Sequence, residues 1–185
     1  MADAAPLKPK RHLPGDRRPD TRAMIRVDQA GEVGAARIYA GQLAVMGGRH
    51  KHAGEIRHMA VQEQRHLEGM NRIMTARGVR PTLLGPFWHV AGFALGAGTA
   101  LLGPRAAMAC TEAVETVIDA HYGEQTEALA DGRDPELKAM IDDYRADEVE
   151  HREAAAAHTG GGAFPVLESL IRAGCRTAIA VAKKI

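Results

Sequence analysis

The sequence predicts a single all-α domain built as a four-helix bundle, with a long apolar crossover and an additional amphipathic helix near the C-terminus. In four stretches of the chain, apolar residues recur every three or four positions, which is the spacing of one helix face. Typical metal-ligand residues interrupt these four faces in the order Glu, Glu-x-x-His, Glu, Glu-x-x-His. They are Glu32, Glu63, His66, Glu115, Glu148 and His151.

The first two helices are expected over roughly residues 21 to 47 and 51 to 77. Glu32 interrupts the apolar face of the first helix, and Glu63 and His66 lie on the apolar face of the second. A buried charge without a partner is costly, so these polar residues require an explanation. The apolar residues of the two faces are Ile25, Ala36, Tyr39, Leu43, Met46, Ile56, Met59, Leu67, Met70 and Met74.

The third and fourth helices of the bundle are expected over roughly residues 104 to 131 and 134 to 158. Glu115 lies on the apolar face of the third helix, and Glu148 and His151 lie on that of the fourth. The other residues of these two faces are Met108, Thr111, Ile118, Tyr122, Leu129, Leu137, Met140, Ile141, Tyr144 and Ala155.

Spacing alone does not identify a site, because three Glu-x-x-His pairs occur where chance predicts ~0.6. The third pair, Glu55 and His58, falls on the flank of its helix beside solvent-facing charges, and we interpret it as a solvated coincidence. Glu112 lies at the edge of the third apolar face, so Glu115 is the least certain ligand on spacing grounds.

Position along the bundle is a second criterion. Glu32 precedes the first expected turn by about as many residues as separate that turn from Glu63, so at ~1.5 Å per residue the two side chains share one level. Glu115 and Glu148 stand in the same relation to the second expected turn. All six candidates are therefore expected to meet in the middle of the bundle.

The chemistry of this set indicates a two-metal centre. Two divalent or trivalent cations would balance four buried carboxylates and two imidazoles, which otherwise pay a desolvation cost or take up protons. Glutamate and histidine ligands converging from four helices are typical of di-iron carboxylate bundles. Hard oxygen ligands without a thiolate favour iron or manganese over structural zinc, so we expect two iron ions as the cofactor.

Composition excludes other classes of protein. The 185 residues suffice for one domain, and a formal net charge of +1 gives no electrostatic footprint for nucleic acid. The two cysteines, Cys110 and Cys175, lie in apolar helical sequence, so neither a disulfide framework nor a thiolate site is expected.

Residues 83 to 103 contain no Asp, Glu, Lys or Arg. A membrane span here would separate the first two helices from the last two, and the ligands would not meet. Pro86 and five glycines predict a broken helix at a surface, serving as the single long crossover of a ferritin-like bundle. Its apolar surface is expected to contact lipid.

The two ends of the chain lie outside this bundle. Residues 164 to 185 predict an amphipathic helix that rests on a membrane surface, and the alternative is packing against the crossover or the bundle. Residues 1 to 20 are Pro-rich and basic in patches and are expected to form a disordered tail, which leaves residues 21 to 185 as the ferritin-like di-iron domain.

Four motifs resemble the demethoxyubiquinone hydroxylases of ubiquinone biosynthesis, and the resemblance covers roughly residues 21 to 182. The motifs are IRVDQAGEVGAARIYAGQ, QEQRHL, GFALGAGTALLG and AMACTEAVETV. The resemblance implies the same six metal ligands and favours Glu115 over Glu112. Glu112 itself departs from the family, whose members commonly have an apolar residue there, and its role stays open.

The resemblance further implies an O₂-dependent di-iron monooxygenase that hydroxylates the ring of a polyprenylated demethoxyquinol, 3-demethoxyubiquinol. It also implies a peripheral membrane protein on the cytoplasmic face of a bacterial inner membrane, or on the matrix face of the mitochondrial inner membrane. A lipid-binding partner protein is a further implication. By the same likeness, His121 and Tyr122 would lie by the quinone or its electron path, the alternative for Tyr122 being a plain core position.

Asp147, directly before Glu148, is the candidate hydrogen-bond acceptor for a ligand histidine, with a solvated aspartate as the alternative. Two other functions are alternatives for this sequence. An iron-binding or peroxide-scavenging ferritin-like protein would have the same ligands and no organic substrate. A helical interaction protein would bind no metal.

Overall fold

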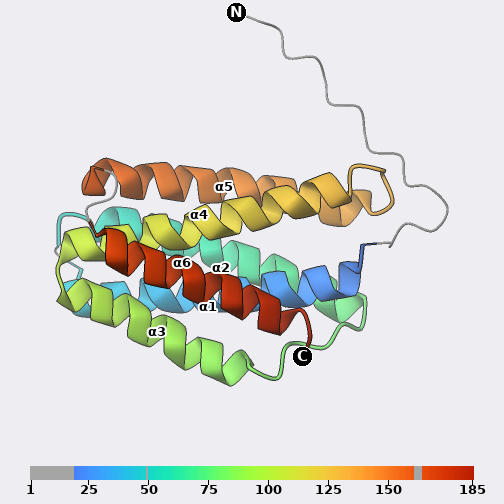
Figure 1. The fold of residues 1–185 in the computed structure, drawn as a ribbon, viewed down its shortest axis with the longest axis horizontal. Coiled ribbons are helices and arrows are strands. Elements are labelled where there is room, and N and C mark those ends of the chain that lie inside the picture. The colour runs from blue at the N-terminus through green and yellow to red at the C-terminus, as the bar shows by residue number, and fades with distance from the viewer. Residues whose placement is uncertain (1–18, 49, 161–163) are drawn as a thin grey trace, which may run out of the picture.

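The computed structural model describes residues 19–48, 50–160 and 164–185, and these residues form six helices and no strand. The all-α prediction is confirmed (Figure 1). The expected tail at residues 1 to 20 lies outside the described residues, apart from its last two positions. The helices are α1 (Thr21–Met46), α2 (Ala53–Ala76), α3 (Gly85–Leu101), α4 (Pro104–Ala128), α5 (Pro135–Thr159) and α6 (Pro165–Ala182).

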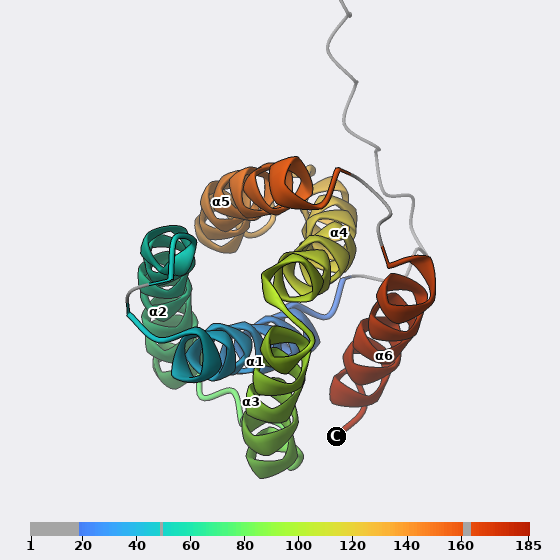
Figure 2. The same cartoon turned by 90° about the vertical axis from the view of Figure 1, so that its left-hand side faces the viewer.

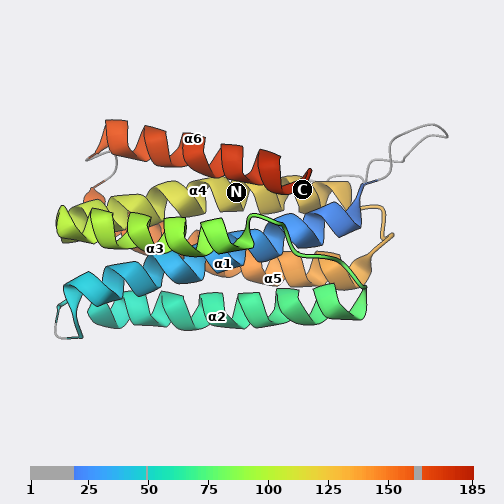
Figure 3. The same cartoon turned by 90° about the horizontal axis from the view of Figure 1, so that it is seen from below.

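Helices α1, α2, α4 and α5 surround a common interior, seen end-on in Figure 2. Short turns join α1 to α2 and α4 to α5, which makes the members of each pair antiparallel. Helix α3 and the segment that precedes it carry the chain back along the bundle, so α4 runs in the same direction as α2 (Figure 3). This single long crossover is the ferritin-like arrangement that the sequence predicts.

Local sequence fixes where the helices of the bundle begin. The side chain of Asp20 accepts a hydrogen bond from the backbone N–H of Ala23 at 3.0 Å and caps α1. Asp134 caps α5 in the same way, through the N–H of Leu137 at 3.1 Å. Helices α4 and α5 both begin with proline, which is tolerated in a first turn because no intrahelical hydrogen bond is lost there.

The prediction of a broken helix at residues 83 to 103 is wrong, because α3 is continuous over 17 residues. Pro86 lies in its first turn, where it breaks nothing. The glycines allow close packing: a Cβ at Gly92 would lie 2.7 Å from the carbonyl oxygen of Gly34, and one at Gly96 would overlap that of Ile38. They therefore bring the backbones of α3 and α1 together.

Helix α6 lies outside the bundle along α4, on the side where α3 lies along α1 (Figure 2). Ile171 is buried in a cluster with Ile38 and Val114, whereas Val166 and Leu170 are exposed. The helix is amphipathic, as expected, and its buried face packs on the bundle. Within the described residues, no helix combines the length and the apolar character needed to cross a membrane.

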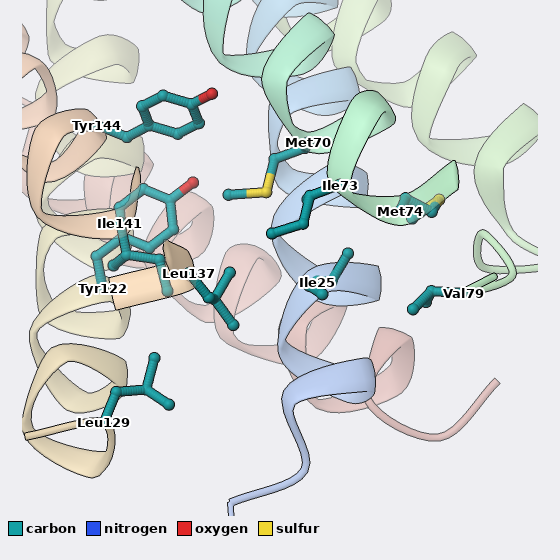
Figure 4. Close-up of a cluster of buried hydrophobic side chains, with 10 residues drawn as sticks. All are labelled: Ile25, Met70, Ile73, Met74, Val79, Tyr122, Leu129, Leu137, Ile141 and Tyr144. Carbon is teal, nitrogen blue, oxygen red and sulfur yellow. The ribbon is translucent and has the colours of Figure 1, made fainter. Parts of the chain in front are cut away.

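Two apolar clusters occupy the bundle interior at different levels. One includes Ile25, Met70, Leu137 and Ile141, which point toward one another from three helices in Figure 4. The other cluster is formed by Tyr39, Ile56, Met59, Met108 and Ala155. The two clusters leave the middle of the bundle to polar side chains.

The close contact of α3 with α1 predicts that Gly96→Ala destabilises the protein. The added methyl group would overlap the α1 backbone, and overpacking of this kind costs about 1–3 kcal/mol in the free energy of unfolding. Gly98→Ala is the matched control on the same helix, because nothing lies within 4 Å of its Cβ position. We expect Gly98→Ala to be neutral or slightly stabilising in urea denaturation, and equal losses in both variants would contradict the argument.

Candidate metal centre

The six candidate ligands converge in the middle of the bundle, and each is at most 2 % exposed. Their ligand atoms form two groups, within each of which all atoms lie within 4.8 Å of one another. Glu63 and Glu148 belong to both groups, so the two groups are neighbours that share two carboxylates. The first group is Glu32, Glu63, His66 and Glu148, and the second is Glu63, Glu115, Glu148 and His151.

The distances within each group are those of atoms around a common cation. The Nδ1 atom of His66 lies 3.2 Å from Glu148 and 3.6 Å from Glu32. The Nδ1 atom of His151 lies 3.3 Å from both Glu63 and Glu148. Two ligand atoms that each lie ~2.0–2.2 Å from one metal ion are separated by roughly 3 to 3.5 Å.

Both imidazoles are oriented by their outer nitrogen atom. The Nε2 atom of His66 lies 2.9 Å from the carboxylate of Asp147, and that of His151 lies 3.0 Å from the amide oxygen of Gln62. An imidazole that donates its Nε2–H presents the Nδ1 lone pair to the interior. Among the described residues, neither Nδ1 atom has a hydrogen-bond partner.

Asp147 is itself held in place from α2. Arg65 donates a hydrogen bond to it at 2.6 Å and contacts the Tyr144 ring, and that ring stacks on His66 with centroids 4.1 Å apart. Burial raises the pKa of Asp147, but the hydrogen bonds from His66 and Arg65 outweigh it and lower the pKa. The aspartate is therefore ionised and favours the Nε2–H tautomer of His66.

Two buried tyrosines fix the terminal carboxylates. Tyr39 donates a hydrogen bond to Glu115 at 2.8 Å, and Tyr122 donates one to Glu32. Each bond engages Oε1 of the glutamate, and the Oε2 atoms of Glu32 and Glu115 have no hydrogen-bond partner among the described residues. Sequence reasoning placed Tyr39 on the helix face of Glu32, but did not predict that it would contact Glu115.

The charges of these six residues do not balance one another when no cation is present. Burial, reinforced by the neighbouring carboxylates, raises the pKa of Glu63 and of Glu115 well above the usual range. Burial also raises the pKa of Glu148, but the neighbouring imidazoles of His151 and His66 outweigh it and lower the pKa to about 2. Some carboxylates must therefore keep a proton unless a cation replaces it.

The residues present fit a pair of metal ions. Both carboxylate oxygens of Glu63, one oxygen of Glu148 and both Nδ1 atoms are buried without a hydrogen-bond partner among the described residues. Buried polar atoms normally have partners, so a concentration of exceptions at one place points to an ion. Four carboxylates and two imidazoles without a thiolate match iron or manganese.

A second polar network adjoins the centre on one side. Asp28, one helical turn before Glu32, lies 3.3 Å from the Nε2 atom of His121 and accepts a hydrogen bond from Gln125 at 2.7 Å. Sequence reasoning singled out His121 but missed Asp28 and Gln125. Asp28 could have been found from its spacing, because it lies one helical turn before Glu32 on the same helix. Nothing in the sequence pointed to Gln125.

The remaining acidic candidates lie away from the centre. Glu112 accepts a hydrogen bond from the Thr159 hydroxyl at 2.6 Å, which ties α4 to the end of α5. Glu55 and His58 do not act as a pair, because His58 is exposed while Glu55 contacts His158 on α5. Glu55 is thus only half-exposed and has a partner, where the sequence indicated a solvated residue.

The chain is similar in sequence to a family of known proteins. The sequence model of the family described as ubiquinone biosynthesis protein COQ7 matches residues 19–182. A 3-demethoxyubiquinol 3-hydroxylase of Rhodospirillum rubrum is 54% identical over 179 residues, which cover 94% of this chain and 83% of the relative. The Homo sapiens mitochondrial NADPH-dependent 3-demethoxyubiquinone 3-hydroxylase is 48% identical, covering 88% of this chain and 76% of that protein. A Saccharomyces cerevisiae mitochondrial 5-demethoxyubiquinone hydroxylase is 44% identical, covering 88% and 77%.

Proposed function

The chain belongs to the family of ubiquinone biosynthesis protein COQ7, and from this premise we propose that it hydroxylates 3-demethoxyubiquinol at a centre of two iron ions. The observation that carries the di-iron part is the pair of buried ligand groups that share Glu63 and Glu148. Glu32 and His66 would complete the site of one ion, and Glu115 and His151 that of the other. When bound, two irons supply the electrons and the Lewis acidity needed to activate O₂.

The surrounding residues position and shield the centre. Asp147 and Gln62 orient the two imidazoles, and Tyr39 and Tyr122 each hold one oxygen of a terminal carboxylate. The apolar clusters above and below exclude water from the bundle interior. A dry site strengthens each of these polar interactions and protects reactive species from side reactions.

The substrate class follows from a pocket beside the centre. A space of about 430 Å³ lies between α1, α3, α4 and α6, and it is lined by apolar residues and glycines. A smaller space reaches from its wall to the metal ligands and to His121 and Tyr122. Gly31, Ala35 and Ile118 line both spaces. We propose that the polyprenylated ring approaches the centre through this wall, beside His121 and Tyr122.

Lipid access explains the surface around this pocket. Leu83, Phe87 and Val90, at and near the start of α3, and Val166 and Leu170 on α6 are all exposed. Helix α6 also carries basic residues, which favour an anionic lipid surface. We propose peripheral attachment to the cytoplasmic face of a bacterial inner membrane, or to the mitochondrial matrix face. The same surface suits a lipid-binding partner protein.

Iron storage or peroxide removal is the competing function. Such a protein needs the same ligands but has no use for an apolar pocket beside them. The pocket between α3 and α6 therefore favours an organic substrate. Quinone extraction from cells that lack this gene separates the two functions, because accumulated demethoxyquinone supports the hydroxylase and unchanged quinones with raised peroxide sensitivity support the alternative.

Iron loading is expected to depend on Glu148. Glu148→Ala removes a ligand that both sites share, so we expect anaerobic reconstitution to give two irons per chain in the wild type and a loss of the coupled two-iron signal in the variant. Glu150→Ala is the control, because Glu150 is exposed on the same helix. Elemental analysis with Mössbauer spectroscopy measures both quantities. A wild type that holds at most one iron would exclude the proposed centre.

Blocking the pocket is expected to impair substrate binding while leaving the metal in place. Gly174 on α6 lines the pocket and has open space at its Cβ position, so Gly174→Leu fills the cavity without a backbone clash. We expect KM for a short-chain demethoxyquinol to rise about tenfold, the effect of ~1.4 kcal/mol of lost binding, at unchanged iron content. Gly98→Leu, on the exposed face of α3, is the control. Unchanged KM in both variants would place the substrate elsewhere.

Membrane attachment is expected to require the exposed apolar residues of α3 and α6. We expect the wild type to co-sediment with anionic liposomes, and the double variant Phe87→Ser, Leu170→Ser to lose most of this binding, because both side chains are more than half exposed. Val61→Ser is the control, since Val61 is 70% exposed on α2. Soluble behaviour of the wild type, with and without quinone, would reject attachment.

A further inference from the structure

A second cluster of metal-ligand side chains lies at one end of the bundle. His52 precedes α2, Glu55 lies in the first turn of α2, and His158 lies in the last turn of α5. Each of the three offers one ligand atom, and these atoms lie within 4.8 Å of one another. The cluster therefore brings together the beginning of one bundle helix and the end of another, which are more than 100 residues apart in the chain.

The contacts within this cluster converge on one carboxylate oxygen. Oε2 of Glu55 lies 2.7 Å from Nε2 of His158 and 3.9 Å from Nδ1 of His52. The two imidazole rings meet edge-on with centroids 4.2 Å apart. His50 lies beside them, but its Nδ1 atom accepts a hydrogen bond from the backbone N–H of His52, and it is not one of the three converging ligands.

This cluster is separate from the central site. Glu55 precedes Glu63 by two helical turns and His158 follows His151 by about two turns, so roughly 10 Å separates the two levels. The apolar side chains of Ile56, Met59 and Ala155 belong to the intervening cluster. A cation held at the end of the bundle would thus be distinct from the pair proposed in its middle.

An ordinary ion pair accounts for only part of this arrangement. Glu55 and one protonated histidine would form a complete pair, whereas here two imidazoles face the same oxygen. Burial, together with the neighbouring His158, Lys51 and His50, lowers the pKa of His52, so its imidazole is neutral and retains a lone pair. Two nitrogen donors and one carboxylate on a partly exposed surface form a coordination set rather than a salt bridge.

We propose that His52, Glu55 and His158 bind a divalent cation of borderline character, zinc above all, and thereby fasten the start of α2 to the end of α5. Two imidazoles and one carboxylate are a common zinc ligand set, and a water molecule takes the fourth tetrahedral position. Tetrahedral ligand atoms lie about 3.3 Å apart, so His158 must withdraw slightly from Glu55 and His52 must approach it slightly. The position of His52 at the beginning of α2 permits its side chain to move.

The test compares zinc binding in four full-length, untagged chains: the wild type, His52→Ala, His158→Ala and the control His58→Ala. His58 is an exposed histidine on α2, one turn from Glu55, and it is not part of the cluster. After equilibration at the same buffered, saturating free Zn²⁺ concentration, elemental analysis is expected to show one fewer zinc per chain in His52→Ala and in His158→Ala than in the wild type. His58→Ala is expected to match the wild type.

Zinc bound at the central site contributes equally to the zinc content of all four chains, because all four keep the six central ligands. Zinc is also expected to raise the Tm of the wild type and of His58→Ala by more than that of His158→Ala, whereas the Tm values without zinc show that each variant folds. Equal zinc content in all four chains would overturn the proposal. A loss in His58→Ala as large as that in His158→Ala would also overturn it, since binding would then be unspecific.

Discussion

Four carboxylates and two imidazoles share the dry interior of one helix bundle, and the structure is organised around this concentration of ionisable groups. Burial raises the pKa of Glu63 and Glu115, and the neighbouring imidazoles lower that of Glu148, so the set cannot be fully ionised on its own. Cations between the groups remove this conflict, because they replace protons and satisfy the unpartnered atoms. Four helices of similar length bring these side chains together at one level of the bundle.

The crossover connects this constraint to the surface of the molecule. A long connection lets α4 run in the same direction as α2, and α3 forms most of it as a continuous helix along α1. Its glycines let it approach α1 closely, and α6 lies across from it along α4. The apolar pocket lies between these two outer helices, and it shares lining residues with the smaller space next to the candidate metal ligands.

The convergence of the six candidate ligands was predictable because it depends only on helical periodicity and rise, which are properties of the backbone. Asp147 was predicted as the acceptor for a ligand histidine because it directly precedes Glu148, whereas Gln62 illustrates what was harder to predict. Which neighbour meets which imidazole depends on how α2 and α5 are rotated against each other, and periodicity does not determine that angle. The continuity of α3 was missed for a related reason, since its glycines looked like helix breakers until the α1 backbone they contact was known. These glycines serve the packing of α3 against α1, and the local sequence does not reveal that contact.

The surroundings of the centre differ on its two sides, and this asymmetry suits the proposed reaction. On the side of α2 and α5, His66 is linked through Asp147 to Arg65, which is half-exposed, so a polar route connects the centre to water. On the side of α3 and α6, the neighbouring space is apolar. A hydroxylase that takes a lipid-soluble ring and O₂ and forms water needs an apolar entrance and a separate route for protons. An iron store needs the polar route alone, and the apolar pocket between α3 and α6 would have no role in it.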